Sequence, residues 1–134
     1  MREILFKAKT EGGRWIYGDL IHYESGEIAI VEDPFSKYGR EATEIAGRTK
    51  VIPETVCQYT GLTDKNGNKI WENDVVANKN YRHPVQISWS TEFGGWVAIQ
   101  IKIRTSELIG EVYQKDCEVI GNIFDNPELM KEGQ

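Results

Sequence analysis

The sequence has few residues that carry metal or redox chemistry. Its 134 residues include two cysteines, Cys57 and Cys117, and two histidines, and no CxxC pair occurs. A structural zinc ion needs four such ligands in one cluster, and these four residues lie far apart in the sequence. No zinc site is therefore expected. A disulfide is arithmetically possible, but the apolar, β-like surroundings of both cysteines favour two reduced, buried thiols. We therefore expect neither a metal nor a cofactor.

Long hydrophobic runs and excess positive charge are also missing. No run approaches the roughly 20 apolar residues of a membrane span, and the opening segment MREILFKAK lacks the apolar core of a signal peptide. We expect no membrane contact and a cytoplasmic location. The net charge is −5. Nucleic-acid-binding domains use surfaces rich in lysine and arginine to neutralise phosphates, so nucleic acid is the less favoured partner.

Motifs of catalysis are absent as well. No serine lies in a G-x-S-x-G elbow and no G-x-x-x-x-G-K-[ST] phosphate loop occurs. Asp74, at the entrance of a predicted strand, is expected to fix a turn by accepting hydrogen bonds from backbone N–H groups. The sequence nominates no catalytic residue, and we expect that the protein is not an enzyme.

The segment DKNGN at residues 64–68 carries oxygen ligands at alternate positions, as the start of an EF-hand does. The sixth loop position, which needs glycine, is Lys69, and the twelfth, which needs a bidentate glutamate, is Val75. A β-hairpin turn is therefore favoured over calcium binding, with Asn66 and Gly67 expected at positive φ.

A period of two dominates the rest of the chain and predicts β-strands. Residues 85–90 and 97–104 form the firmest hairpin, joined by the glycine-bearing segment 91–95. Other strands are predicted at residues 4–6, 15–23, 28–31 and 116–124, the last with Gly121 as a bulge or a close-approach point. Asn126 and Pro127 predict the start of a short helix. The second strand of the firm hairpin should bury one face, made of Val97, Ile99, Ile101 and Ile103.

Residues 32–49 show little periodicity and predict a long connection, with a helical turn at 41–46. A loop of this length is either functional or a boundary between sub-domains. We therefore divide the chain into residues 1–50 and 51–134, or treat it as one continuous domain.

Two stretches combine aromatic and basic residues as partner-binding surfaces do. One lies within the long connection and the other follows the strand that begins near Asp74. This pairing can stack bases and bind phosphates, and it also suits protein interfaces; an ordinary solvated loop remains open for each. Between the two partners the overall charge favours protein. The candidate contacts are Phe35, Lys37, Tyr38, Arg40, Lys79, Tyr81 and Arg82.

The segment PETVCQYTGLTDKNGNKIWENDVV at residues 53–76 resembles the YopX family, small proteins encoded by phages and prophages of mainly Gram-positive bacteria. The opening MREILFKAK, the segment RWIYGDL at residues 14–20 and EVIGNIFDNPEL at residues 118–129 resemble the family in the same order. One departure is Asn73, where the family usually has glycine. Asparagine also tolerates positive φ, so we expect the turn to be kept.

The resemblance implies a mainly β protein with a small SH3-like barrel, which we assign to residues 51–134, and self-association. It implies no activity, because the family has no established biochemical role. We expect a phage- or prophage-derived accessory protein in the bacterial cytoplasm that is a homo-oligomer and contacts a host or phage protein. Sharing a strand face between subunits would also cover sheet edges in so small a β chain. A nucleic-acid-binding SH3-like module is the alternative.

Overall fold

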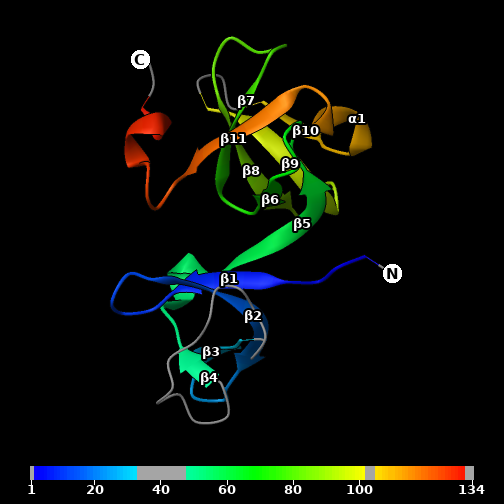
Figure 1. Cartoon of the computed structure of the whole chain (residues 1–134). Coiled ribbons are helices and arrows are strands. Elements are labelled where there is room, and N and C mark those ends of the chain that lie inside the picture. Colours follow the sequence, from blue (N-terminus) through cyan, green and yellow to red (C-terminus); the bar gives the residue numbers. More distant parts are fainter. Residues whose placement is uncertain (1, 33–47, 102–104, 132–134) are drawn as a thin grey trace. The chain divides into compact units, whose positions relative to one another are not determined.

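The computed structural model describes residues 2–32, 48–101 and 105–131 and is built mainly of β-strands (Figure 1). The predicted mainly β, antiparallel class is confirmed. The predicted helical turn at 41–46 and the candidate contacts Phe35, Lys37, Tyr38 and Arg40 lie outside the described residues. No helix in the described part of the chain is long and apolar enough to cross a membrane.

The chain divides into two compact units, Met1–Tyr59 and Thr60–Gln134. The boundary lies within strand β5 (Cys57–Thr63), whereas the sequence-based division was placed after residue 50. The long connection is not the boundary because the chain returns from it into strand β4 (Arg48–Lys50), which pairs with β3 (Ile28–Val31) in unit 1. The three residues of β4 alternate too briefly to be recognised in the sequence.

Unit 1 is an antiparallel sheet in the order β4-β3-β2-β1-β5, with β1 at Phe6–Lys9 and β2 at Trp15–His22. The predicted strands at 15–23 and 28–31 are confirmed, and a 3₁₀ turn, Pro53–Thr55, leads into β5. One face of the sheet forms the core, because apolar residues of alternate positions meet there. Its members are Ala8, Ile16, Ile30 and Val51, with Phe6, Leu20, Ile28 and Val56 packed against them.

Unit 2 contains an antiparallel sheet in the order β10-β9-β8-β7-β11, and strand β6 (Lys69–Trp71) follows β5 in the other sheet. Over the described residues both strand orders are open, so the strand pairing forms sheets rather than a closed barrel. The elements are β7 (Asp74–Asn78), β8 (Val85–Ser90), β9 (Gly95–Gln100), β10 (Ser106–Leu108), helix α1 (Glu111–Gln114), β11 (Cys117–Asn122) and a 3₁₀ turn (Pro127–Met130).

The β8–β9 hairpin confirms the firmest sequence prediction, but its buried face is only partly as predicted. Ile87 pairs with Ala98, and it is Ala98, not Val97 or Ile99, that packs in the main core cluster. Val97 is nevertheless buried and Ile99 is half-buried. Both faces of β9 are therefore partly covered. The sequence does not reveal this, because the face that carries Ala98 also carries polar Gln100 and is therefore predicted to be exposed. The cluster comprises Ile70, Val76, Val85, Ile87, Ala98 and Cys117.

The turn at residues 64–68 is held by the buried carboxylate of Asp64. Its Oδ1 accepts hydrogen bonds from the N–H groups of Asn66 and Asn68, each at 2.9 Å, and its Oδ2 accepts one from Val119 of β11 at 3.0 Å. Gly67 has φ 83°, as predicted, while Asn66 does not have positive φ. Burial opposes ionisation of Asp64, but these hydrogen bonds outweigh it and hold its pKa below the ordinary 3.8.

The next turn also follows its prediction. The Oδ2 atom of buried Asp74 accepts a hydrogen bond from the Trp71 N–H at 2.8 Å, and Asn73 between them has φ 71°. Asparagine thus takes the left-handed conformation expected of it.

In β11 the register shifts between Val119 and Gly121, and a Cβ at Gly121 would meet the Asn126 side chain. Gly121 is therefore both a bulge and a close-approach point.

We predict that Gly18→Ala destabilises unit 1 by about 2–3 kcal/mol, because its Cβ would collide with the backbone carbonyl of Val31. Gly13→Ala is the matched control: Gly13 has open space around it and φ 87°, so only the left-handed conformation costs free energy, about 1 kcal/mol. Amide hydrogen exchange in β2 and β3 measures both changes. If amide protection in β2 and β3 fell equally in the two variants, a collision between the new Cβ and the Val31 carbonyl could not be the cause of the Gly18→Ala effect.

We predict that Asp64→Asn lowers the stability of unit 2 by about 2 kcal/mol at neutral pH, because an amide N–H would face the Val119 N–H. The pKa of Asp64 is lower in the folded protein than its ordinary value of 3.8. Its stabilising effect is therefore fully present above pH 3.8 and is lost as the pH falls through the lower pKa of the folded state. Urea denaturation of the wild-type and Asp64→Asn proteins from neutral to acidic pH should therefore show that the difference between their free energies of unfolding becomes smaller below pH 3.8. If this difference in free energy of unfolding did not change with pH, the ionised carboxylate of Asp64 could not be its cause.

Candidate functional site

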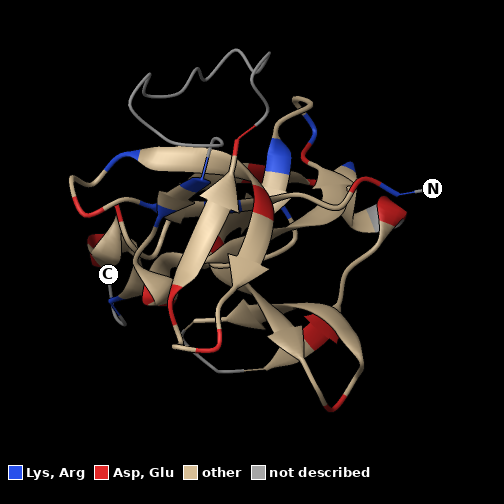
Figure 2. Ribbon diagram, turned by 90° about the horizontal axis from the view of Figure 1, so that it is seen from below, with Lys and Arg blue, Asp and Glu red and all other residues tan. Residues whose placement is uncertain are grey.

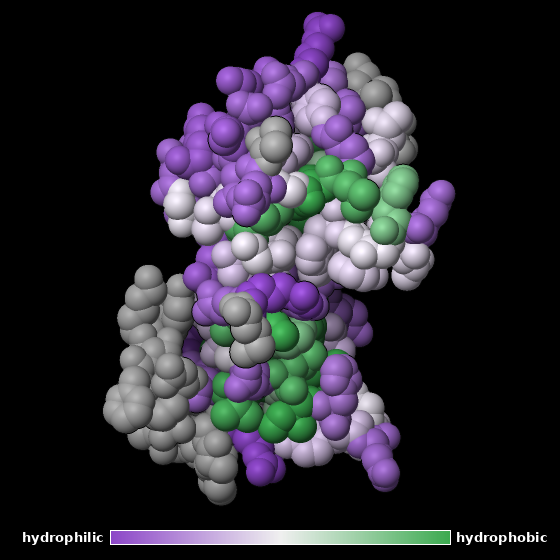
Figure 3. Space-filling view, turned by 90° about the vertical axis from the view of Figure 1, so that its right-hand side faces the viewer, coloured by the Kyte–Doolittle hydropathy of each residue, from purple (hydrophilic) through white to green (hydrophobic). Residues whose placement is uncertain are grey.

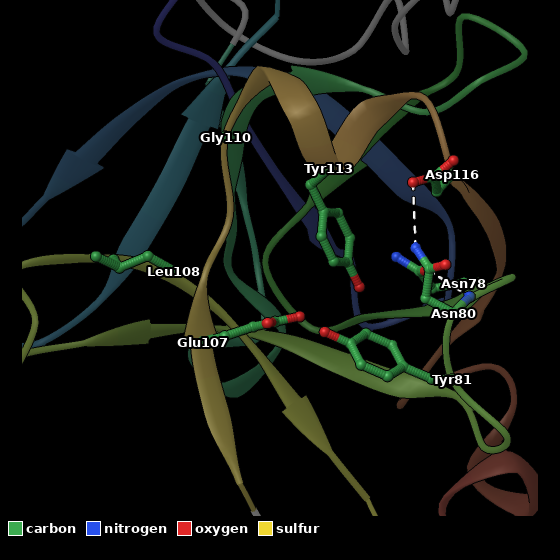
Figure 4. A pocket seen from close by; sticks show the side chains of 8 residues that line it. All are labelled: Asn78, Asn80, Tyr81, Glu107, Leu108, Gly110, Tyr113 and Asp116. Atoms are coloured by element: carbon green, nitrogen blue, oxygen red, sulfur yellow. Dashed lines mark hydrogen bonds between the residues drawn. The ribbon is translucent and has the colours of Figure 1, made fainter.

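Unit 2 contains a cavity of about 240 Å³ beside the end of β7 and strand β10 (Figure 4). Its walls come from the end of β7, the loop that follows, β10 and the segment around α1. None of its lining residues is a lysine or arginine. The lining residues are Asn78, Asn80, Tyr81, Glu107, Leu108, Gly110, Tyr113 and Asp116.

One wall is built by the turn that ends β7. The Asn78 side chain is buried, and its Oδ1 accepts a hydrogen bond from the Asn80 N–H at 2.8 Å. The Asn78 carbonyl accepts a second bond from the Tyr81 N–H at 2.9 Å. An asparagine that bonds the backbone two residues ahead reverses the chain. This reversal brings half-buried Tyr81 against the core cluster and to the edge of the cavity.

The opposite wall is helix α1, which carries Tyr113. The Tyr113 N–H donates to the Gly110 carbonyl at 2.9 Å, and the ring packs against the core cluster. Its hydroxyl oxygen is buried, yet among the described residues it makes no hydrogen bond of good geometry. Burial raises the pKa of Tyr113 above its ordinary value, and the Asn78 side chain beside the hydroxyl offsets only part of this rise. The hydroxyl is therefore protonated at neutral pH.

Two carboxylates face the cavity, and they differ in their partners. Asp116 forms an ion pair with Lys79 at 3.0 Å, and the Asn80 Nδ2 group donates to it at 3.2 Å. The Lys79 contact is the main reason why the pKa of Asp116 lies below its ordinary value. Glu107, from the middle of β10, is exposed, and its carboxylate makes no ion pair or hydrogen bond within the described residues. Figure 4 shows the side chains of Glu107 and Tyr81 pointing toward one another, with the Tyr113 hydroxyl directed at the same space.

Of the predicted contacts Lys79, Tyr81 and Arg82, only Tyr81 is among the residues that line this cavity. Lys79 borders it through the ion pair with Asp116, and Arg82 is exposed without lining it. Sequence reasoning missed Glu107 and Tyr113. The elements that carry them, a three-residue strand and a four-residue helix, are too short to leave a periodic pattern.

The reactive side chains of unit 2 are in unreactive forms. Burial raises the pKa of the Cys117 thiol to about 11, and the charges of Asp64 and Asp116 contribute. Cys117 is therefore a thiol at neutral pH, and both it and Cys57 are buried and outside any disulfide, as expected. Within the described residues, no three His, Cys, Asp or Glu side chains are grouped to hold a metal ion.

A second surface is the aromatic tip of the β8–β9 hairpin, defined by Trp89, Phe93 and Trp96. The two tryptophans pair across the strands and meet edge to face, with ring centroids 5.2 Å apart. The Ser90 carbonyl and side chain accept the N–H groups of Gly94 and Phe93 and close the turn. Trp89 and Phe93 nevertheless expose 48% and 49% of their surface. Figure 3 shows that apolar residues reach the surface of both units on the face it draws.

The comparisons with known proteins give a family and a structural neighbour. A family model described as YopX protein matches residues 5–131. The crystal structure of protein EF1440 from Enterococcus faecalis is similar, with a TM-score of 0.59 and 26% sequence identity, and the match covers 98% of this chain and 100% of that one. No curated protein matches the chain significantly.

We predict that Tyr113→Phe leaves the stability of unit 2 unchanged or raises it by up to about 1 kcal/mol. A buried hydroxyl without a hydrogen bond costs free energy, and its removal leaves the packing of the ring intact. Urea denaturation followed by the fluorescence of the unit 2 tryptophans measures the change. A loss of more than about 1 kcal/mol would mean that the hydroxyl has a strong partner within the fold.

Proposed function

Because the chain belongs to the YopX protein family, we propose that it is a non-enzymatic accessory protein of phage or prophage origin that acts through contacts with other proteins, further copies of itself included. The observation that carries this proposal is the aromatic tip. Two large aromatic side chains are about half exposed at the end of one hairpin, next to a third. Soluble proteins rarely leave tryptophan and phenylalanine together on the surface unless a partner covers them.

Three features support a role without catalysis. The thiol of Cys117 and the hydroxyl of Tyr113 both have raised pKa values, which keeps them protonated and weakly nucleophilic. The buried carboxylates Asp64 and Asp74 are engaged in holding turns. The described residues that line the cavity include no serine, threonine, cysteine, histidine or lysine, which are the residues that most often serve as the nucleophile or its activating base in acyl transfer.

Self-association through the aromatic tip follows from the same arrangement. A two-fold contact places the same surface of two copies face to face, and flat aromatic rings pack well against their own kind. Glu92 is the one charged residue in the segment 89–96, and this low charge reduces the cost of removing the tip from water. Leu108 adds to this apolar surface, because its Cδ2 lies 3.1 Å from where a Cβ at Gly95 would be and its side chain is 57% exposed.

Nucleic acid receives less support as a partner. Lys79 is engaged with Asp116, and the cavity next to Tyr81 presents the carboxylate of Glu107, which would repel phosphate. Figure 2 shows acidic residues interspersed with basic ones along the described chain. A phosphate-binding surface would instead gather its lysines and arginines on one side.

We predict that the wild-type protein is oligomeric at tens of micromolar and that Trp89→Ser with Phe93→Ser weakens its association about tenfold or more. Removing two half-exposed aromatic side chains takes away apolar area that the contact buries, and a tenfold change corresponds to about 1.4 kcal/mol. Size-exclusion chromatography with light scattering over a concentration series measures the change.

Tyr23→Ser is the control, because Tyr23 is an exposed aromatic of unit 1 that is outside the tip. It should leave the association unchanged. A monomeric wild-type protein at these concentrations would refute self-association, and equal weakening by both variants would refute the aromatic tip as its surface.

A further inference from the structure

We propose that the cavity beside β10 binds the guanidinium group of an arginine carried by an extended segment of a partner polypeptide. The proposal rests on the proposed function, since it names the chemistry of one protein partner. It concerns the cavity and the outer edge of β10 and is argued from Glu107, Tyr81 and Tyr113, none of which belongs to the aromatic tip; Leu108 lies next to both surfaces.

The charge of the cavity selects a cation. Of the two carboxylates that line it, Asp116 already has Lys79 at 3.0 Å, whereas Glu107 makes no ion pair within the described residues. Because no lysine or arginine is among the described residues that line the cavity, this part of the chain leaves the charge of Glu107 without a cationic partner. An anionic ligand would be repelled, and a cation would supply the missing partner.

The shape and the hydrogen-bonding groups favour a guanidinium over a compact ammonium. The hydroxyl oxygen of Tyr113 is buried, and within the described residues it makes no hydrogen bond of good geometry, although the Asn78 side chain lies beside it. It points into the space faced by Glu107 and Tyr81 (Figure 4). A planar guanidinium has five N–H groups, so it can donate to the Glu107 carboxylate and to the Tyr113 oxygen at once. The rings of Tyr81 and Tyr113 offer aromatic surface to its face. The unsatisfied hydroxyl thereby gains the partner that the fold does not provide.

The neighbouring edge strand indicates that the cation belongs to a polypeptide. Strand β10 is the last strand of its sheet, and all three of its residues are exposed. The side that faces away from β9 has no strand partner in the described part of the chain. An extended segment can add to such an edge through main-chain hydrogen bonds, and side-chain pockets beside the edge then give specificity.

The same register argues against a second copy of this chain at the edge. Glu107 is the middle residue of β10, so two copies of β10 paired antiparallel about a two-fold axis would place Glu107 opposite Glu107. Like charges directly opposite each other destabilise a strand pair, whereas opposite charges stabilise it. The edge is therefore complementary to a basic segment from another protein.

The test is a titration of the full-length ¹⁵N-labelled protein, followed by NMR, with the capped tripeptide acetyl-Val-Arg-Val-amide. The matched probe carries citrulline in place of arginine, which keeps the shape and removes the charge. We expect shift changes at Tyr81, Glu107 and Tyr113, and at least about tenfold weaker binding of the citrulline peptide. Acetyl-arginine-amide alone should bind more weakly than the tripeptide because it cannot pair with β10.

Two variants locate the effect. Glu107→Gln should abolish the preference for arginine over citrulline, and Tyr113→Phe should weaken arginine binding without loss of stability. Glu92→Gln is the control, because Glu92 is an exposed glutamate of unit 2 in the β8–β9 turn, outside the cavity. It should leave the preference unchanged.

Four results would overturn the proposal: equal binding of the two tripeptides, shift changes confined to other surfaces, the same loss in Glu92→Gln as in Glu107→Gln, or no binding. Equal affinity for acetyl-arginine-amide and the tripeptide would refute the polypeptide as the occupant. Light scattering on Glu107→Gln separates the two proposals, since self-association through the aromatic tip should survive this change. Arginine binding by a monomeric wild-type protein would support the cavity while refuting the tip.

Discussion

The carboxylate of Asp64 connects two parts of unit 2 that are far apart in sequence. Its one oxygen closes the turn at residues 64–68, and its other oxygen accepts the backbone N–H of Val119 in β11. The neighbouring backbone follows the same path, because the Lys65 N–H donates to the Cys117 carbonyl at 3.0 Å. Since β11 pairs with β7, this carboxylate connects the turn before β6 to the five-stranded sheet of unit 2. The position of the cavity depends on it indirectly, because both β7 and the segment before β11 supply cavity residues.

The acidic residues of the chain therefore serve two purposes: some keep the surface hydrated, and others hold the fold through hydrogen bonds. Asp64 and Asp74 are almost fully buried and accept hydrogen bonds from backbone N–H groups, so both carboxyl groups serve to hold the fold. Cys117 lies close enough to Asp64 that this charge helps raise its pKa. An acidic residue that is bound in this way contributes to the net charge without contributing to a binding surface.

The sequence predicted those elements whose local pattern and tertiary environment agree. Strands β2 and β3, the β8–β9 hairpin, the Asp74 turn and the bulge at Gly121 all have clear local signals. Asn73 at positive φ shows that even a departure from the family can be interpreted. The sequence failed where contacts distant in the chain decide. Strand β4 exists because β3 offers it an edge, and Ala98 lies in the core because Ile87 pairs with it. The candidate site was found only through Tyr81 and its neighbour Lys79, since Glu107 and Tyr113 reach the cavity on elements of three and four residues.

The polar groups of the cavity separate into those that the fold needs and those that it does not. Asn78 reverses the chain after β7, and Asp116 binds Lys79 and Asn80, so a structural role accounts for both. The Tyr113 hydroxyl has no such role in the described part of the chain: it is buried without a hydrogen bond of good geometry, and phenylalanine would fill the same space at lower cost in free energy. The carboxylate of Glu107 is likewise unnecessary to a strand that pairs through its backbone. Local choices in a folded chain normally agree with its stability, and disagreement concentrates at sites of function. Two such groups facing the same space are therefore better explained by a ligand than by the fold.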